Sequence, residues 1–436
     1  MTNTRIDFKL NGRNLRTDLI NITIFLSVLT VCLIQTFHLS SILYFLIDVP
    51  ILIMISFNLK KFTIVLLNRQ VVVITVLLFL AFIFSLISCF INNVPFGNFI
   101  YGCYKYFRNF LFFYCVFAFT DERSEGQVYK IFVSIYWINI VLTLVEYFLF
   151  GINQDLLGGV FGLEMGVNQY TNLFFVIISV YCIEKLVYHD ANKKEYRIIL
   201  IMVAGMLAVS ALAEIKFYFA EFLILFMIAY FCMPKKHKAL LGILIAIVCV
   251  VIFYNILIRN FPEFKGLVSD LKNGGLYRLW DLQRHYSTDY DIGRGVIFSY
   301  SNKYLIPRKI NQWIGLGIGS VSSSSMVDNH FWVQNQSTHY DQFYTSYLYN
   351  EQGIVGFIIY CFIFIYMLFI GIKSIMRTST RKYGTMLVML VVGSIMIFVY
   401  NMALYSQLAF IAFWMLAILI KKCGESSLKG KHNNDT

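Results

Sequence analysis

Long apolar segments separated by short polar turns make up most of this chain. A helix of about 20 apolar residues spans a bilayer. About twelve such runs occur, near 19–37, 41–57, 71–91, 99–119, 128–150, 169–188, 197–213, 216–232, 239–258, 354–372, 384–401 and 404–420. The alternating segments of a membrane β-barrel do not occur. The pattern therefore predicts an all-α polytopic membrane protein with about twelve transmembrane helices.

One long polar stretch, residues 259–353, interrupts the apolar pattern. It is rich in Tyr, Trp, Phe and Ile, unlike a disordered tail, and a loop of this length is usually functional. We expect short helices at Leu276 to His285 and Arg294 to Tyr304, and a turn at Ser320 to Ser325.

These features divide the chain into four parts. We expect an N-terminal membrane region at 1–258 with about nine helices and a large external loop at 259–353. A C-terminal membrane region with about three helices follows at 354–421, and a tail at 422–436 ends the chain. The first apolar run has no small-residue cleavage site after it, so we expect it to be retained as a helix.

Composition agrees with a membrane protein: 58% of residues are hydrophobic and 14% are charged, against roughly 25% charged in soluble domains. The net charge of +12 could suggest nucleic acid as a partner. The basic residues lie in short turns between apolar runs, however, where membrane topology explains them. None of the nine cysteines lies in the long loop and no CxxC pair occurs, so we expect no metal site.

Lys and Arg gather in alternate turns. The short turns near 38–40, 92–98, 151–168 and 402–403 contain neither residue. The positive-inside rule then places both termini in the cytoplasm and the 259–353 loop outside. The turn that contains Lys216 is the exception among the short outer turns.

Two charged residues lie within one apolar run. Lys105 and Arg108 are three residues apart, so they share a helix face. Charged groups in a membrane span are costly and often functional, which makes both candidates for binding an anionic substrate. The alternative is that they pair with Asp48 or Glu146 and only hold the helices together.

Lys216 is a further candidate because it lies in an outer turn where other short turns lack cations. Cations at this leaflet suit a lipid-linked anion, since guanidinium and ammonium groups bind phosphates. Glu214 could orient or neutralise Lys216. The alternative is that Lys216 only extends towards the interface.

The long loop and its flanks resemble the bacterial O-antigen polymerase and ligase superfamily. The resemblance rests on the order of short motifs over roughly residues 200–370. They are Ala213-Glu214-Ile215-Lys216, then Arg294 with an aromatic-rich helix, Trp313-Ile314-Gly315-Leu316-Gly317-Ile318-Gly319, His339-Tyr340, and Tyr349-Asn350-Glu351-Gln352-Gly353-Ile354-Val355-Gly356. The family often has Ser-Arg at the first motif and a Trp after the Arg. This chain has Glu214-Ile215-Lys216 and Gly295-Val296 instead.

The resemblance implies an inverting glycosyltransferase in the bacterial inner membrane. Its donor is an oligosaccharide on undecaprenyl diphosphate, and its product is O-antigen, the glycan of lipopolysaccharide, or capsular polysaccharide, made at the periplasmic face. No nucleotide, metal or other cofactor is implied. A chain-length regulator is implied as a partner. The O-antigen ligase is the alternative activity within the family.

Such chemistry assigns roles to residues of the loop. A hydroxyl nucleophile needs a general base, and His is the usual one near neutral pH, so His339 leads, with His285 and His330 as rivals. Tyr340 and Asp341 lie beside His339, and Asp341 or Glu351 could orient its imidazole. Arg294 and Lys216 are expected to stabilise the departing diphosphate.

Arg278 and Arg284 are further candidates for binding the diphosphate or the glycan. The alternative for these arginines is salt bridging with Asp281, Asp289 or Asp291. The glycine run is expected to form a tight turn with close backbone packing. It lacks the Gly-Lys-Ser/Thr of a nucleotide loop.

Two other classes of protein, a transporter and a scaffold, remain alternatives. A lipid-linked oligosaccharide flippase suits the helices and buried charges, but transporters usually bind near the midplane and show paired repeats. A scaffold protein is a third reading. A dolichol-type glycosyltransferase would want acidic residues in the first external loop, and His38 to Ser40 contains none.

Overall fold

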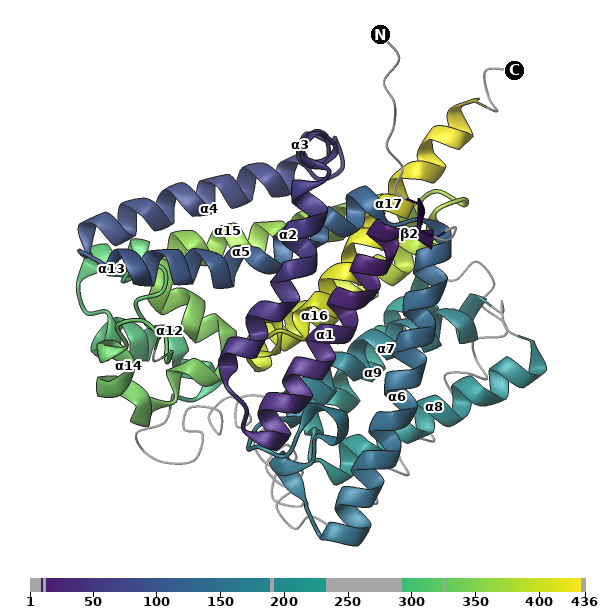
Figure 1. Ribbon diagram of the computed structural model, residues 1–436, viewed down its shortest axis with the longest axis horizontal. Helices are drawn as coiled ribbons and strands as arrows, with labels where there is room; N and C mark the ends of the chain where they lie inside the picture. Colours follow the sequence, from purple (N-terminus) through teal and green to yellow (C-terminus); the bar gives the residue numbers. More distant parts are fainter. Residues whose placement is uncertain (1–8, 11–12, 189–191, 233–291, 325, 433–436) are drawn as a thin grey trace.

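The computed structural model describes residues 9–10, 13–188, 192–232, 292–324 and 326–432 (Figure 1). Helices dominate the described chain. A short hairpin, β1 (Lys9–Leu10) and β2 (Arg13–Asn14), precedes α1 (Leu15–Phe37). The predicted all-α membrane class is confirmed at this level.

Among the described residues, seven helices are long and apolar enough to cross a membrane. They are α1, α4 (Val72–Ile91), α6 (Glu122–Phe150), α7 (Asn168–Tyr188), α8 (Lys193–Leu212), α15 (Tyr344–Ile375) and α16 (Arg381–Tyr400). The number rises to eight if one bent pair of helices is counted as a single span. In that pair, η1 (Ser41–Ile47) and α2 (Asp48–Ser56) are bent by 92° from α3 (Leu59–Leu66).

Three more helices occupy predicted runs without meeting the same test. They are α5 (Phe96–Phe119), α9 (Lys216–Cys232) and α17 (Ala409–His432). Polar side chains, Lys105 and Arg108 among them, make α5 less apolar, and α9 has only 17 residues. The predicted run 239–258 lies outside the described residues.

Two predicted boundaries were wrong. α15 begins at Tyr344 rather than near 354, and α17 continues to His432 rather than ending near 421. In α15, Gly353 has a non-helical backbone, so the predicted start marks a break inside a longer helical segment.

Contacts between turns divide the bundle into two ends. At one end His38 pairs with Glu164 at 2.8 Å, and the backbone N–H of Met402 donates to Gln169 Oε1 at 3.2 Å. Because the turns that lack Lys and Arg meet here, we call this the loop end. The turns rich in Lys and Arg meet at the other end, the basic end, where Lys382 pairs with Glu184 at 2.6 Å. The grouping of turns matches the charge pattern, and which end faces the cytoplasm stays a prediction.

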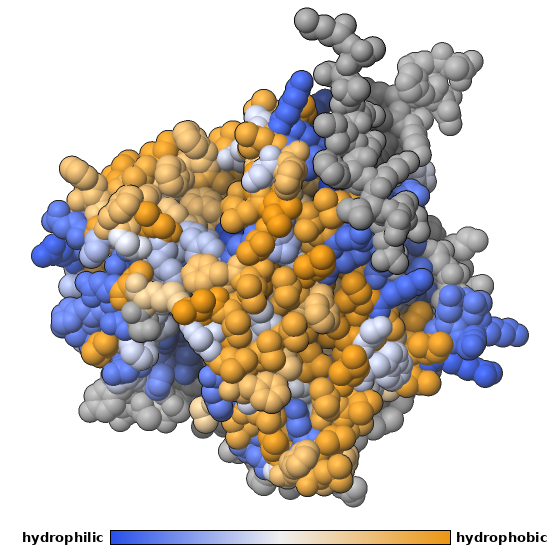
Figure 2. All heavy atoms as spheres, in the orientation of Figure 1, coloured by the Kyte–Doolittle hydropathy of each residue, from blue (hydrophilic) through white to orange (hydrophobic). Residues whose placement is uncertain are grey.

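α17 forms the centre of the bundle. Its residues from Ala409 to Ile420 are buried on every face, and α5, α7, α15 and α16 pack around it. A helix that is apolar all round is typical of such a central position. On the face shown in Figure 2, apolar residues cover α1, α2 and α4, whereas polar residues gather over α12 and α14.

The described part of the predicted loop is folded and lies at the loop end. Its short helices are η5 (Arg294–Val296), α12 (Ile297–Tyr300), η6 (Ser301–Leu305), α13 (Lys309–Ile314), α14 (His330–Asn335), η7 (Gln336–Thr338) and η8 (Tyr340–Gln342). Residues 294–305 are thus helical, as predicted. Ser320 and Val321 lie in a turn, also as predicted, and Leu276 to His285 lies outside the described residues.

This segment has a hydrophobic core of its own. It includes Ile292, Ile297, Val321, Tyr340 and Phe343. Tyr347 of α15 belongs to the same cluster, and Tyr405 of η9 (Ala403–Tyr405) packs against it. The segment is therefore joined to the helix ends beneath it by side-chain packing.

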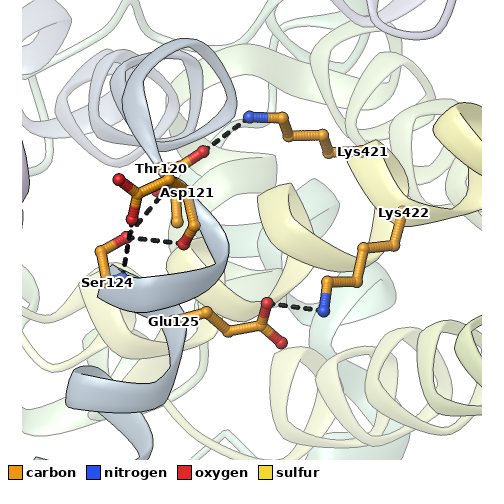
Figure 3. Close-up of polar contacts among 6 residues, drawn as sticks. All are labelled: Thr120, Asp121, Ser124, Glu125, Lys421 and Lys422. Carbon is orange, nitrogen blue, oxygen red and sulfur yellow. Dashed lines mark hydrogen bonds and ion pairs between the residues drawn. The ribbon is translucent and has the colours of Figure 1, made fainter.

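At the basic end, the start of α6 is fixed by a capping box (Figure 3). The Asp121 carboxylate accepts from the Ser124 backbone N–H at 2.8 Å, and the Ser124 hydroxyl accepts from the Asp121 N–H at 3.2 Å. From α17, Lys421 donates to the Thr120 carbonyl at 2.7 Å and Lys422 pairs with Glu125 at 2.6 Å. The α5–α6 turn is thus held to α17.

Asp121→Ala is expected to lower the free energy of unfolding by about 1 kcal/mol, because it removes the acceptor for an otherwise unpaired helix N–H. Thermal unfolding of the purified protein in detergent would measure the loss. Asp121→Asn keeps a capping oxygen and should stay close to wild type. Equal losses in both variants would contradict the role of the cap.

Candidate functional site

A break in α15 organises the loop end. Gly353 has φ 63° and ψ −165°, which separates the helical turns of 344–352 from those of 354–375. Carbonyls at such a helix end lack their usual donors. Here the N–H groups of Leu316 and Gly317 donate to the carbonyls of Asn350 and Glu351, both at 2.9 Å. The segment Gly315–Gly319, which we call the glycine loop, therefore completes the broken helix.

The backbone of this loop requires glycine. Gly315, Gly317 and Gly319 have φ values of 74°, 101° and 81°, a region that residues with a Cβ rarely adopt. A Cβ at Gly315 would also collide with the backbone of Glu351. The prediction of a tight turn with close packing is confirmed.

The glycine loop also contacts α4 and α5. Asn98 of α5 donates from Nδ2 to the Gly319 carbonyl at 3.0 Å, and Ser88 of α4 donates from Oγ to the Gly315 carbonyl at 3.2 Å. Gly102 lies so close to Gly319 that a side chain there would collide with the loop backbone. The loop is therefore inserted between the ends of three helices.

Glu351 ties the loop to the broken helix through its side chain. It is 2% exposed, and its Oε1 accepts from the Gly319 N–H at 2.7 Å. Tyr347 precedes Glu351 by one helical turn in α15, and the Tyr405 hydroxyl donates to the Tyr347 hydroxyl at 3.2 Å. The helical turns before the break thus contact the glycine loop through Glu351 and η9 through Tyr347.

Lys105 of α5 lies over the ring of the same Tyr405. Its Nζ is 5.2 Å from the ring centroid of Tyr405 and 5.9 Å from that of Tyr101. Cations are attracted to the faces of aromatic rings at such distances. Tyr405 in turn packs against the hydrophobic core of the folded loop segment that contains Ile292, Ile297 and Phe343. A cation on α5 therefore lies beside the ring that packs against that segment.

Arg108 has a different environment, although it is one turn away from Lys105. It is 5% exposed, and its Nε is 3.3 Å from Asp48 Oδ1. Tyr104 donates to Asp48 Oδ2 at 2.6 Å, and the guanidinium lies over the rings of Tyr104 and Phe410. Of the two partners proposed from the sequence, Asp48 is the one observed. Glu146 instead accepts from the Gly159 N–H at 2.9 Å.

Arg294 and the Lys216 turn are linked through one aromatic ring. Arg294 Nε donates to the Tyr400 carbonyl at 3.2 Å, and its guanidinium lies 4.2 Å from the Tyr400 ring centroid. The Tyr400 ring also stacks on Phe217, at 4.4 Å between centroids. Lys216, the residue before Phe217, pairs with Glu214 at 3.4 Å. The structure thus brings two of the predicted cations into one neighbourhood.

His339 is exposed in the left-handed backbone region, with φ 50°. Its neighbour Tyr340 is fully buried, and the Tyr340 hydroxyl donates to the Val321 carbonyl at 2.6 Å. Burial, reinforced by the charges of Asp341 and Glu351, raises the pKa of Tyr340. The protonated, buried Tyr340 side chain therefore fixes the backbone next to His339, whose own side chain is exposed.

The residues proposed to orient the imidazole have other observed partners. Asp341 Oδ2 accepts from Trp332 Nε1 at 2.9 Å, and Glu351 accepts from Gly319. His330, a rival base, is exposed and lies 2.8 Å from the Gln334 amide. The remaining candidates from the sequence lie outside the described residues: Arg278, Arg284, His285, Asp281, Asp289 and Asp291.

No protein-family model matches this chain, and no curated protein matches it. The chemistry of the loop end must therefore be argued from its own residues. Cations on α5, on α9 and in the folded loop segment can hold an anion, and an exposed imidazole can accept a proton. Within the described ranges, no group of three His, Cys, Asp or Glu side chains is arranged to hold a metal ion.

Sequence reasoning missed four residues of this site, namely Asn98, Tyr101, Tyr347 and Tyr405. Tyr101 precedes Lys105 by four residues, which is the spacing of neighbours on one helix face, so this contact was open to prediction. Asn98, Tyr347 and Tyr405 carry no such signal, because their partners are distant in sequence.

Proposed function

We propose that this chain is an inverting glycosyltransferase that polymerises oligosaccharide units carried on undecaprenyl diphosphate. The single observation that carries the proposal is the position of Lys105. It is a cation on a membrane helix, beneath a packed polar segment that contributes Arg294 and His339. A lipid-linked diphosphate has its charge at the membrane surface and its sugars above, so both parts of such a substrate find complementary groups.

The proposed reaction uses these residues in distinct roles. A hydroxyl of the acceptor sugar attacks the anomeric carbon of the donor, and the bond from that carbon to the diphosphate oxygen breaks. His339 accepts the proton of the hydroxyl. Lys105, Lys216 and Arg294 stabilise the charge that develops on the departing diphosphate.

The folded external segment favours a polymerase over a flippase. A transporter usually binds its substrate near the midplane, whereas the candidate groups here gather at the loop end. We further propose that the loop end faces the periplasm and that the protein resides in the bacterial inner membrane with both termini in the cytoplasm. The charge pattern of the turns supports this orientation.

Gel profiling of surface polysaccharide in a deletion strain tests the proposal. A polymerase predicts that single repeat units still reach the surface while long chains are lost. Loss of a ligase would leave the lipid core without glycan. Loss of a flippase would strand lipid-linked units on the cytoplasmic leaflet. Normal long chains in the deletion strain would exclude all three activities.

In the same strain, His339→Ala and Arg294→Ala are each expected to abolish long chains at wild-type protein level. Removal of a general base typically lowers the rate about 100- to 10,000-fold. His330→Ala is the matched control, because His330 is an exposed histidine of the same segment. Wild-type chain lengths for His339→Ala, or their loss for His330→Ala alone, would contradict the assignment of His339.

A further inference from the structure

The helix α3 at the basic end has an unusual direction. It is bent by 92° from the Ser41–Ser56 unit that precedes it. Two helices at right angles cannot both follow the membrane normal, so α3 lies close to the membrane plane when α2 crosses the bilayer. A helix in this position contacts lipid headgroups along its length.

The outward surface of α3 and its caps is strongly apolar. Phe57, Leu59, Ile64 and Leu67 are 76%, 61%, 60% and 73% exposed. The inward face, which carries Phe62, is buried against the bundle. Large apolar side chains on a helix in the membrane plane are shielded from water if they enter the boundary between headgroups and acyl chains.

The same surface is cationic. Residues 57–70 include Lys60, Lys61 and Arg69 and no acidic residue. Lys61 Nζ lies 5.1 Å from the ring centroid of Phe119 at the end of α5, and the Arg16 guanidinium of α1 lies 5.8 Å from the same centroid. Two helices, α1 and α3, thus bring positive charge to one patch around Phe119 of α5.

We propose that α3, together with Arg16, binds the headgroups of anionic phospholipids, with its exposed apolar side chains inserted among their acyl chains. The surface selects anionic over zwitterionic lipid because each Lys or Arg near an anionic surface contributes about 1 kcal/mol, roughly fivefold in affinity. This site is separate from the loop end and does not depend on the activity proposed there.

The chain supplies a matched comparison. Lys193 and Lys194 are adjacent exposed lysines at the start of α8, also among the turns of the basic end. They begin a straight span, and Glu195 follows them. This pair has the same two charges as Lys60 and Lys61 without the transverse helix.

The test uses the full-length protein in bilayers of mixed phosphatidylglycerol and phosphatidylcholine. Photoreactive forms of either lipid are crosslinked, and adducts on residues 57–70 are counted by mass spectrometry. We expect the phosphatidylglycerol probe to dominate by roughly tenfold or more. Lys60→Gln/Lys61→Gln should abolish most of this preference, whereas Lys60→Arg/Lys61→Arg should retain it.

Three results would overturn the proposal. Equal labelling of residues 57–70 by both probes would show a surface without selectivity for anionic lipid. An equal loss of labelling there in Lys193→Gln/Lys194→Gln would show a general effect of net charge. Displacement of the lipid by free glycerol phosphate would show a soluble phosphate site. Unfolding midpoints in pure phosphatidylcholine establish that each variant is folded. If the glutamine double variant does not fold, the arginine double variant still tests whether positive charge at residues 60 and 61 maintains the preference for anionic lipid.

Discussion

Arg108→Met is expected to lower the free energy of unfolding by roughly 3–5 kcal/mol, the cost of leaving one member of a buried ion pair without its partner. Arg108 and the Asp48 carboxylate are largely excluded from solvent, with 6% and 15% of their side chains exposed. Without the guanidinium, Asp48 keeps its bond from Tyr104 but loses its counter-charge. Thermal unfolding in detergent, followed by fluorescence-detected size exclusion, would measure the loss.

The double variant Asp48→Asn/Arg108→Met is the informative companion. It removes both charges, so no uncompensated charge remains, and it should recover much of the lost stability. Lys105→Met is the control on the same helix face, because Lys105 is only half-buried and faces aromatic rings. A double variant less stable than Arg108→Met would refute this account of the pair. If the proposed function is correct, Lys105→Met should fold yet make no long chains.

Gly315→Ala is expected to cost roughly 3 kcal/mol or more. Its φ of 74° strains any residue with a Cβ, which costs about 1–3 kcal/mol. The added Cβ would also meet the backbone of Glu351, and overpacking costs a further 1–3 kcal/mol or so. The variant should therefore be poorly folded or retained at low level, as measured by its unfolding midpoint and its membrane abundance.

Gly97→Ala is the matched control for this substitution. Gly97 lies in α5 near the same loop, has no positive φ, and a Cβ there would meet nothing within 4 Å. Because Ala favours a helix interior over Gly by about 1 kcal/mol, Gly97→Ala should be neutral or stabilising. A Gly315→Ala protein as stable as wild type would show that the glycine loop moves away from Glu351 at little cost.

Periodicity and charge predicted much of this fold because both act locally. The run expected at 169–188 is the helix Asn168–Tyr188, and the turns without cations do meet at one end. The bend after α2 was not predictable, since neither Gly nor Pro marks it. There Asn58 Nδ2 donates to the Met54 carbonyl at 3.2 Å and its backbone leaves the helical region.

The candidate site was only partly accessible from sequence. Lys105 and Arg108 look equivalent along the chain, since each is a cation in the same apolar run. Their roles separate because Asp48, which is distant in sequence, meets one of them, whereas Tyr405 faces the other. Long-range packing decides such pairings, and a single sequence contains no local signal for it.

The insertion of the glycine loop between α4, α5 and α15 limits how this protein can be recombined. The folded loop segment cannot be exchanged alone, because Ser88, Asn98 and Gly102 belong to other helices and fit the shape of the glycine loop. A working chimera would have to carry residues 88–102 together with 313–353. If the proposed function is correct, specificity for a new acceptor is more readily engineered by altering exposed side chains of the segment than by transplanting it whole.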